Sequence, residues 1–124
     1  MRTLLGLTGC LVALLMPALV QAQGAQTYPS KTVTVMIPTG QGGPADNEVR
    51  VWMARLSENL GQQFVVDYKP GAGHSIGLSF LAKQKPDGHY LGIATSNMPL
   101  VRLRYPDSGL DPANGFEHIS ELHR

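Results

Sequence analysis

Residues 33–46, VTVMIPTGQGGPAD, decide the fold. The first five are apolar or β-branched, which predicts a buried strand over Thr32–Ile37. Pro38 ends that strand, and glycines that tolerate unusual backbone angles follow it. Pro44 is typical of the first turn of a helix, where its missing N–H would have been unpaired anyway. The stretch therefore predicts a strand, a glycine turn and a helix whose free N–H groups and positive dipole end point into the turn. Such an arrangement is suited to binding an anion.

The helix after this turn is expected over Ala45–Leu60, with Gly61 as a natural stop. Its apolar residues recur at three- and four-residue steps, which predicts one apolar stripe. They are Val49, Trp52, Met53, Leu56 and Leu60. We expect Trp52 and Met53 to be core residues. Asp46 lies in the first helical turn, where a carboxylate favours the helix dipole, so helix-start stabilisation and ligand contact are both open roles for it.

A second strand over Gln63–Tyr68 leads into another glycine turn, Pro70–Ser75, with Ser75 as the expected helix cap. The remaining predicted elements are a helix to about Lys83 with Ile76, Phe80 and Leu81 directed inward, a third strand over Tyr90–Ala94, a short helix over Leu100–Tyr105 and a fourth strand over Phe116–Ile119. Because strands and helices alternate, the fold class is α/β with a mainly parallel sheet. Ligands of such sheets bind beyond the carboxyl ends of the strands.

Three turns are expected at that edge of the sheet: Thr39–Asp46, Pro70–Ser75 and Thr95–Asn97. They carry glycine, hydroxyl or small polar residues and almost no apolar bulk. Backbone amides at two helix starts, helped by hydroxyl groups of the second and third turns, would capture a small dicarboxylate without any arginine. Each helix end contributes roughly 0.3–1 kcal/mol toward a nearby negative charge. The alternative is that the glycines only permit tight packing.

A dinucleotide site is the rival interpretation of the second turn. Residues 71–77, GAGHSIG, follow a strand, open a helix and have glycines at a suitable spacing. Against it, Pro70 stiffens the entry, and Thr95 and Ser96 stand where an acidic residue is expected. The adjacent histidine and serine of this turn do not by themselves form a nucleophile–base pair, and the histidines show no metal-ligand spacing. The sequence therefore predicts no enzyme activity, no cofactor and no metal site.

Composition fits one small globular domain. Of 124 residues, 43% are hydrophobic and 15% are charged, which disfavours disorder. The formal net charge is +1 and no basic stripe exists, which argues against nucleic acid as a partner.

The first 22 residues resemble a secretory signal peptide. Arg2 supplies the positive start, an apolar run follows, and cleavage is expected after Ala22, with Ala25 as the alternative site. A membrane anchor is the other interpretation, but the run is short for a bilayer span. The single cysteine, Cys10, lies in a sequence of lipoprotein form but before most of the apolar run. Cleavage after Ala22 would leave no thiol in the mature chain.

Several motifs occur in series along the chain. They are Tyr28-Pro29-Ser30-Lys31, Pro38 through Gly42-Gly43-Pro44-Ala45-Asp46, Leu60-Gly61-Gln62, Lys69-Pro70-Gly71-Ala72-Gly73, Lys85-Pro86-Asp87-Gly88-His89-Tyr90 and Thr95-Ser96. In this order they resemble the Bug-type extracytoplasmic solute-binding receptors of tripartite tricarboxylate transporters, over nearly all of the mature chain. The resemblance implies a periplasmic-binding-protein-like (type II) fold of two α/β lobes with a ligand cleft between them.

The resemblance also implies a ligand and a partner. Small carboxylates, amino acids or related metabolites would be bound and passed to membrane permease subunits. The ligand-binding residues carried over are Gly42, Gly43 and Asp46 in the first turn, Gly71, Ala72, Gly73, His74 and Ser75 in the second, and Thr95 and Ser96 in the third. Asp46 is where such receptors meet an amino group.

The chain departs from the family pattern at three places. Thr39 stands where a phenylalanine is usual, and His74 and Ser75 stand where glycine and asparagine are usual. If the backbone at His74 is left-handed, we expect strain of roughly 1 kcal/mol. Residues 23–124 resemble the N-terminal lobe alone, with the second lobe incomplete, so the alternative is a truncated remnant that binds nothing. One lobe would offer an open, weaker site and expose apolar surface.

Overall fold

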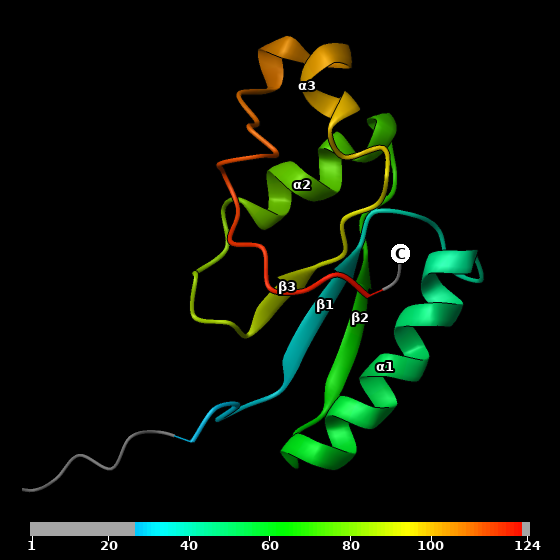
Figure 1. Cartoon of the computed structure of the whole chain (residues 1–124), viewed down its shortest axis with the longest axis vertical. Coiled ribbons are helices and arrows are strands. Elements are labelled where there is room, and N and C mark those ends of the chain that lie inside the picture. The colour runs from blue at the N-terminus through cyan, green and yellow to red at the C-terminus, as the bar shows by residue number, and fades with distance from the viewer. Residues whose placement is uncertain (1–26, 123–124) are drawn as a thin grey trace, which may run out of the picture.

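The computed structural model describes residues 27–122. The predicted signal peptide and Cys10 lie outside these residues. Three parallel strands, β1 (Val33–Ile37), β2 (Phe64–Tyr68) and β3 (Tyr90–Gly92), form one sheet in the order β2-β1-β3. The predicted parallel α/β sheet is therefore confirmed, with β1 at its centre (Figure 1).

The helices occupy nearly the predicted positions. Their bounds are Pro44–Leu60 for α1, Ser75–Leu81 for α2 and Leu100–Arg104 for α3, with short 3₁₀ turns at Ala72–His74 and Pro106–Ser108. α1 ends at Gly61, as predicted, and α2 is two residues shorter than expected. Among the described residues no helix combines the length and the apolar character that are needed to cross a bilayer.

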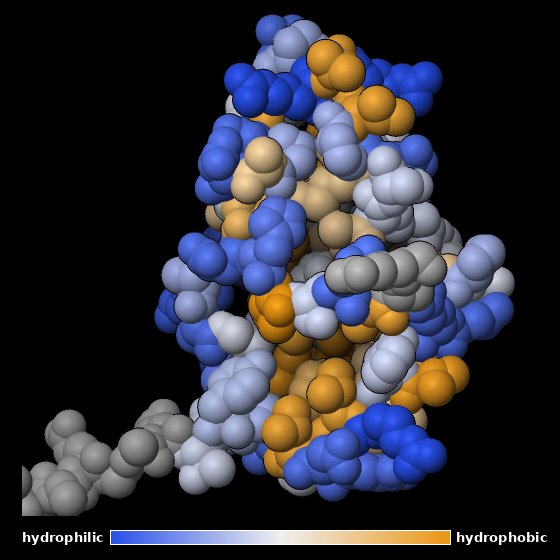
Figure 2. All heavy atoms as spheres, viewed as in Figure 1, coloured by the Kyte–Doolittle hydropathy of each residue, from blue (hydrophilic) through white to orange (hydrophobic). Residues whose placement is uncertain are grey.

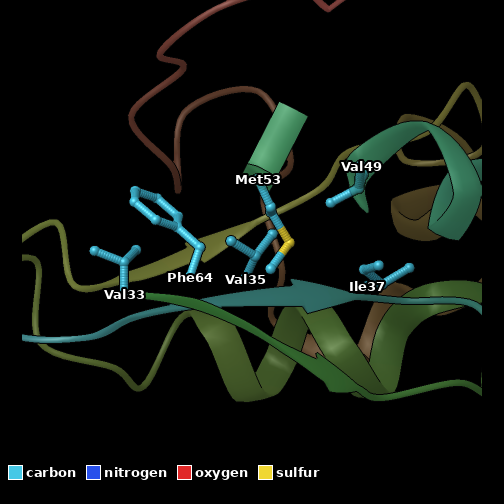
Figure 3. Packing of buried hydrophobic residues seen from close by; sticks show 6 residues of the cluster. All are labelled: Val33, Val35, Ile37, Val49, Met53 and Phe64. Carbon is cyan, nitrogen blue, oxygen red and sulfur yellow. The ribbon is translucent and has the colours of Figure 1, made fainter. Parts of the chain in front are cut away.

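One face of the sheet packs against α1. Alternate residues of β1, namely Val33, Val35 and Ile37, point to this face because successive side chains of a strand alternate. Val49 and Met53 of α1, with Phe64 of β2, complete the cluster. Figure 3 shows these six side chains gathered in the layer between the sheet and α1.

The opposite face of the sheet packs against α2. Met36 is fully buried there and lies close to Gly77 of α2. A Cβ atom at Gly77 would lie 2.9 Å from Met36 Sδ and 3.0 Å from the Lys69 carbonyl oxygen, so only glycine lets the helix approach this closely. A second cluster of Leu78, Met98 and Val101 then joins α2 to α3.

The predicted stripe on α1 is only half buried. Val49 and Met53 are core residues, but Trp52 is 45% exposed, so its predicted core position is wrong. Leu56 and Leu60 are also exposed, at 38% and 41%. A sheet of three strands is too narrow to cover the whole stripe. Figure 2 shows the result in part, as apolar residues gathered over the sheet and α1 on the face in view.

Two predictions for the second half of the chain are also wrong. Ile76 and Phe80 are 51% and 38% exposed, and the buried residues of α2 are Ser75, Gly77 and Leu78. The segment at 116–119 forms no strand, because Phe116 packs against the cluster of Leu78, Met98 and Val101 instead of pairing at the sheet edge.

The strand order fixes where a site is expected. The chain passes from β1 through α1 to β2 on one face, and returns through α2 on the other face to β3. The direction of strand order therefore reverses at β1, and the crevice beyond the carboxyl ends of β1 and β3 is a topological switch point, the usual ligand position in open α/β sheets.

Candidate functional site

A hollow of about 470 Å³ lies at this switch point. Its lining comes from all three predicted turns and consists of Thr39, Gly40, Gln41, Gly43, Pro44, Ala45, His74, Thr95 and Asn97. In Figure 1 the strands run upward and these turns lie beyond their tips. Among residues 27–122 the lining has no acidic residue, lysine or arginine, and His74 is its one titratable side chain.

The first turn is held in shape by Asp46. The carboxylate, which is 2% exposed, accepts hydrogen bonds from the Gly42 backbone N–H at 2.8 Å, the Tyr68 hydroxyl at 2.7 Å and Arg50 Nε at 3.0 Å. Arg50 Nη2 also donates to the Tyr68 hydroxyl at 2.6 Å. Asp46, the third residue of the helix, thus accepts a hydrogen bond from the backbone of the turn before the helix, much as the acidic member of a capping box does.

These contacts set the charge state of the group. The Gly42 N–H, followed by the Tyr68 hydroxyl and the Arg50 guanidinium, lowers the pKa of Asp46 below its ordinary value. Burial and the hydrogen bond to the Asp46 carboxylate raise the pKa of Tyr68. Asp46 is therefore an ionised, fully engaged structural residue beneath the turn, and it does not line the hollow.

The start of α1 opens on the hollow. Gly43 occupies the N-cap position and has no side chain to cap the helix, and Pro44 follows as the first helical residue. The first α-helical bond of this terminus runs from the Asn47 N–H to the Gly43 carbonyl, so the N–H groups of Ala45 and Asp46 have no acceptor within the helix. The hollow is thus next to free backbone donors and the positive end of the longest helix.

The second turn is left-handed. Four successive residues have positive φ angles: Gly71 at 122°, Ala72 at 42°, Gly73 at 56° and His74 at 80°. The left-handed angle expected at His74 is therefore present. It costs a non-glycine residue about 1–2 kcal/mol, so the backbone is strained at His74. The predicted cap at Ser75 is wrong, since α2 begins at Ser75 with His74 in the cap position and no side-chain cap bond.

This geometry turns His74 toward the third turn. His74 Nδ1 lies 3.0 Å from Thr95 Oγ1, so one hydrogen bond joins the loops that follow β2 and β3. Both residues line the hollow. His74 Nε2 makes no hydrogen bond within the part of the chain that the structure describes.

The structure brings together only some of the predicted site residues. Gly43, His74 and Thr95 line the hollow, whereas Gly42 and Asp46 support the first turn from behind. The others lie outside the lining, and they are Gly71, Ala72, Gly73, Ser75 and Ser96. At the start of α2, His74 in the cap position lines the hollow, whereas Ser75 does not. The side chains of Gln41 and Asn97 were missed, although polar residues in the predicted turns were a usable signal.

A second hollow, of about 510 Å³, lies near the amino ends of β1 and β3. There His89 stands between Ser30 and Asp87, with 3.4 Å separating Nε2 from Ser30 Oγ and Nδ1 from Asp87 Oδ1. The order matches that of a serine–histidine–acid catalytic triad. However, Nε2, which would have to accept the serine hydroxyl proton, already accepts the Ser30 backbone N–H at 3.3 Å. This contact fastens the segment before β1 to the turn before β3. Within residues 27–122 no cluster of three or more histidine, cysteine or acidic residues is placed to hold a metal ion.

Comparison with known proteins decides the family. The family model described as "Tripartite tricarboxylate transporter family receptor" matches residues 49–124. The chain belongs to this receptor family. A UPF0065 protein of Bordetella bronchiseptica is 43% identical to the receptor chain over 122 residues, covering 98% of this chain and 35% of the relative.

Solved structures agree on the fold. The periplasmic binding protein BugD matches with a TM-score of 0.68 and 32% identity, over 73% of this receptor chain and 30% of BugD. An R. palustris protein solved with adipate matches with a TM-score of 0.56 and 38% identity, over 57% of this chain and 24% of that protein. The Bug-type resemblance and the periplasmic-binding-protein fold are therefore confirmed. The receptor chain spans about a third of the length of the curated relatives it matches, 31% and 35% in two of them.

Proposed function

We propose that this chain belongs to a periplasmic solute-binding component that captures a small carboxylate-type metabolite for a tripartite tricarboxylate transporter. Residues 1–22 would direct export, residues 23–124 would form the N-terminal lobe, and membrane permease subunits would receive the ligand. The observation that carries the proposal is the hollow in front of the uncapped start of α1, whose described lining residues include no acidic side chain. An anion there would accept hydrogen bonds from backbone N–H groups that have no acceptor within the helix.

Two further observations support a ligand rich in oxygen atoms. Thr39 lines the hollow, and its hydroxyl is shielded from solvent with no hydrogen-bond partner among the described residues. Buried hydroxyls normally have a partner, which a ligand oxygen or a bridging water would provide. The R. palustris relative was solved with adipate, a linear dicarboxylate. The proposed contacts are the α1 start at Gly43–Ala45, with Thr95 and Asn97.

Calorimetry against a panel of di- and tricarboxylates, with adipate first, tests the proposal. We expect heat of binding from at least one member at millimolar concentration or below, and none from an uncharged diamide of the same length. Absence of heat from the whole panel would contradict the carboxylate assignment. A cooperative thermal transition in the same preparation would separate that outcome from an unfolded remnant.

A pair of charge variants sharpens the test. Ala45→Asp places a carboxylate on the lining of the hollow, and at the second helical position an aspartate also favours the helix dipole, so the fold should be kept. We expect adipate binding to weaken by at least about tenfold, through repulsion at short range.

Asn47→Asp is the matched control. It adds the same charge to the same turn of α1, but Asn47 is exposed and lies outside the lining. Its effect on binding should be several-fold smaller, because solvent screens the added charge. Equal losses in the two variants would show that the ligand does not lie at the α1 start.

A further inference from the structure

The part of the lining that the structure describes contains one ionisable side chain, the imidazole of His74. The other described lining residues are glycine, alanine, proline, threonine or amides, so His74 is the one of them that can carry a charge. Histidine is the side chain that gains and loses a proton between about pH 5 and 8. This makes His74 the natural place for the hollow to discriminate between ligands of different charge.

The backbone of His74 has a left-handed conformation that is unfavourable for a histidine. Its φ of 80° lies in the left-handed region, which is costly for a residue with a Cβ atom. Sparsely populated backbone angles persist only where the surrounding structure enforces them, and they concentrate at ligand sites. The hydrogen bond from the ring to Thr95 provides one such constraint, because it fixes the ring against the third turn.

Protonation of the ring would change two donors at once. In a neutral ring that accepts the Thr95 hydroxyl proton at Nδ1, that hydroxyl hydrogen is occupied. In the imidazolium form Nδ1 donates to Thr95 Oγ1, so the hydroxyl hydrogen becomes free for another acceptor. Nε2, which makes no hydrogen bond in the described residues, carries an N–H in both of these forms, so protonation leaves this donor in place. An anion in the hollow would therefore gain a positive charge and a hydroxyl donor together.

Few other charges face this ring. In the first turn the acidic group is Asp46, which is engaged by Gly42, Tyr68 and Arg50. From α3, the Arg104 side chain and Tyr105 lie against Gly73, with Tyr105 Cε2 3.3 Å and Arg104 Cδ 3.8 Å from where a Cβ atom of that glycine would stand. The third turn, 95–97, has no titratable side chain.

We propose that His74 is the specificity-determining residue of the hollow, positioned by Thr95, and that it makes dicarboxylate binding tighter at pH 6 than at pH 8. The inference rests on the proposed function. Hydrogen bonds to charged groups are stronger than those between neutral groups. We therefore expect the dissociation constant for adipate to be roughly tenfold lower at pH 6 than at pH 8. Adipate is mainly the dianion over this range, and its partial protonation at pH 6 would weaken binding, so tighter binding at pH 6 belongs to the protein.

Calorimetry of the full chain with adipate at pH 6, 7 and 8 tests the inference. His74→Asn is the informative variant, because asparagine tolerates the left-handed backbone and keeps hydrogen-bonding capacity but does not titrate. His118→Asn is the matched control, since His118 is exposed and lies outside the lining. The wild type and the control should show the same pH profile, and His74→Asn should bind equally at all three pH values. Melting curves check that each variant is folded.

The outcomes separate the two claims. Wild-type binding whose pH dependence survives in His74→Asn would overturn the inference and leave the proposed function standing. Absence of adipate binding at every pH would overturn both. Thr95→Val gives a second check, because it removes the hydroxyl but not the ring. It should reduce the pH effect without abolishing it, whereas an unchanged profile would contradict the positioning role of Thr95.

Discussion

Asp46 accepts hydrogen bonds from the first turn, from α1 and from β2. Its buried carboxylate therefore ties the glycine turn to both elements that follow it. All three partners are donors, so the site requires an acceptor-only group. An amide would turn an N–H group toward at least one of these donors.

Asp46→Asn is therefore expected to destabilise the chain. The melting temperature at pH 7 should fall by roughly 4–8 °C, the shift that a modest stability change produces in a domain of this size. Because the pKa of Asp46 is lowered from 3.8 in the folded chain, its contribution is present above that value and is lost as the pH falls through the folded pKa. Melting curves from pH 7 to pH 3 should show the difference between variant and wild type shrinking below about pH 3.8.

Glu58→Gln is the control for this prediction. Glu58 pairs with Arg55 at 3.3 Å, but both side chains are mostly exposed, so this ion pair contributes little. Its loss should leave the melting temperature nearly unchanged at every pH. A constant Asp46→Asn difference down to pH 3 would show that the carboxylate charge is not what stabilises the turn.

At the residue scale the sequence located the turns but not the roles within them. Asp46 and Tyr68 are far apart in sequence, and nothing in the local pattern at residues 42–46 shows that a tyrosine of the next strand will engage the carboxylate. Asn97 lies in a predicted turn, yet whether its side chain faces the hollow depends on how the loops after β1 and β3 pack together. Tertiary contacts, not local propensity, make these assignments.

At the scale of elements, α2 is placed by a glycine. Gly77→Ala would improve intrinsic helix propensity by about 1 kcal/mol. In this position, however, the added methyl group meets Met36 Sδ at 2.9 Å, the Lys69 carbonyl oxygen at 3.0 Å and Pro38 Cβ at 3.3 Å. A backbone oxygen cannot rotate away as a side chain can, so the helix must move off the sheet.

We expect Gly77→Ala to lower the free energy of unfolding by about 1–3 kcal/mol. Denaturant unfolding measures this directly. Ser79→Ala on the same helix is the control, because it also improves helix propensity and has no such close approach; its effect should stay within about 0.5 kcal/mol. Stabilisation by Gly77→Ala would mean that α2 does not lie this close to β1.

Periodicity predicted the long helix well and the short elements poorly. α1 has a proline at its start, a glycine at its end and a repeated apolar spacing, and its predicted bounds differ by one residue from those observed. The predicted strand at 116–119 had only a short apolar run to support it. Phe116 packs with Leu78, Met98 and Val101 across the chain, a contact that no local pattern reveals.

For the whole molecule, a three-stranded sheet with α1 on one face and α2 on the other leaves much apolar surface uncovered. Trp52, Leu56 and Leu60 recur every four residues on one side of α1, and each is more than a third exposed. Contiguous exposed apolar surface promotes association more than the same residues scattered singly. The apolar exposure expected from the resemblance to one lobe is therefore present on this helix.

Replacing part of this surface should change how the chain behaves in solution. We expect Trp52→Gln combined with Leu56→Gln to reduce concentration-dependent self-association in the micromolar range, because both side chains lie outside the core that Val49 and Met53 form with the sheet. Sedimentation velocity over a concentration series measures the effect. Ile119→Gln, at a residue that is 77% exposed in a different segment, controls for exposure alone and should change little. Equal behaviour of the double variant and the wild type would show that the surface of α1 does not drive association, and a cooperative melt of the double variant would confirm that its fold is kept.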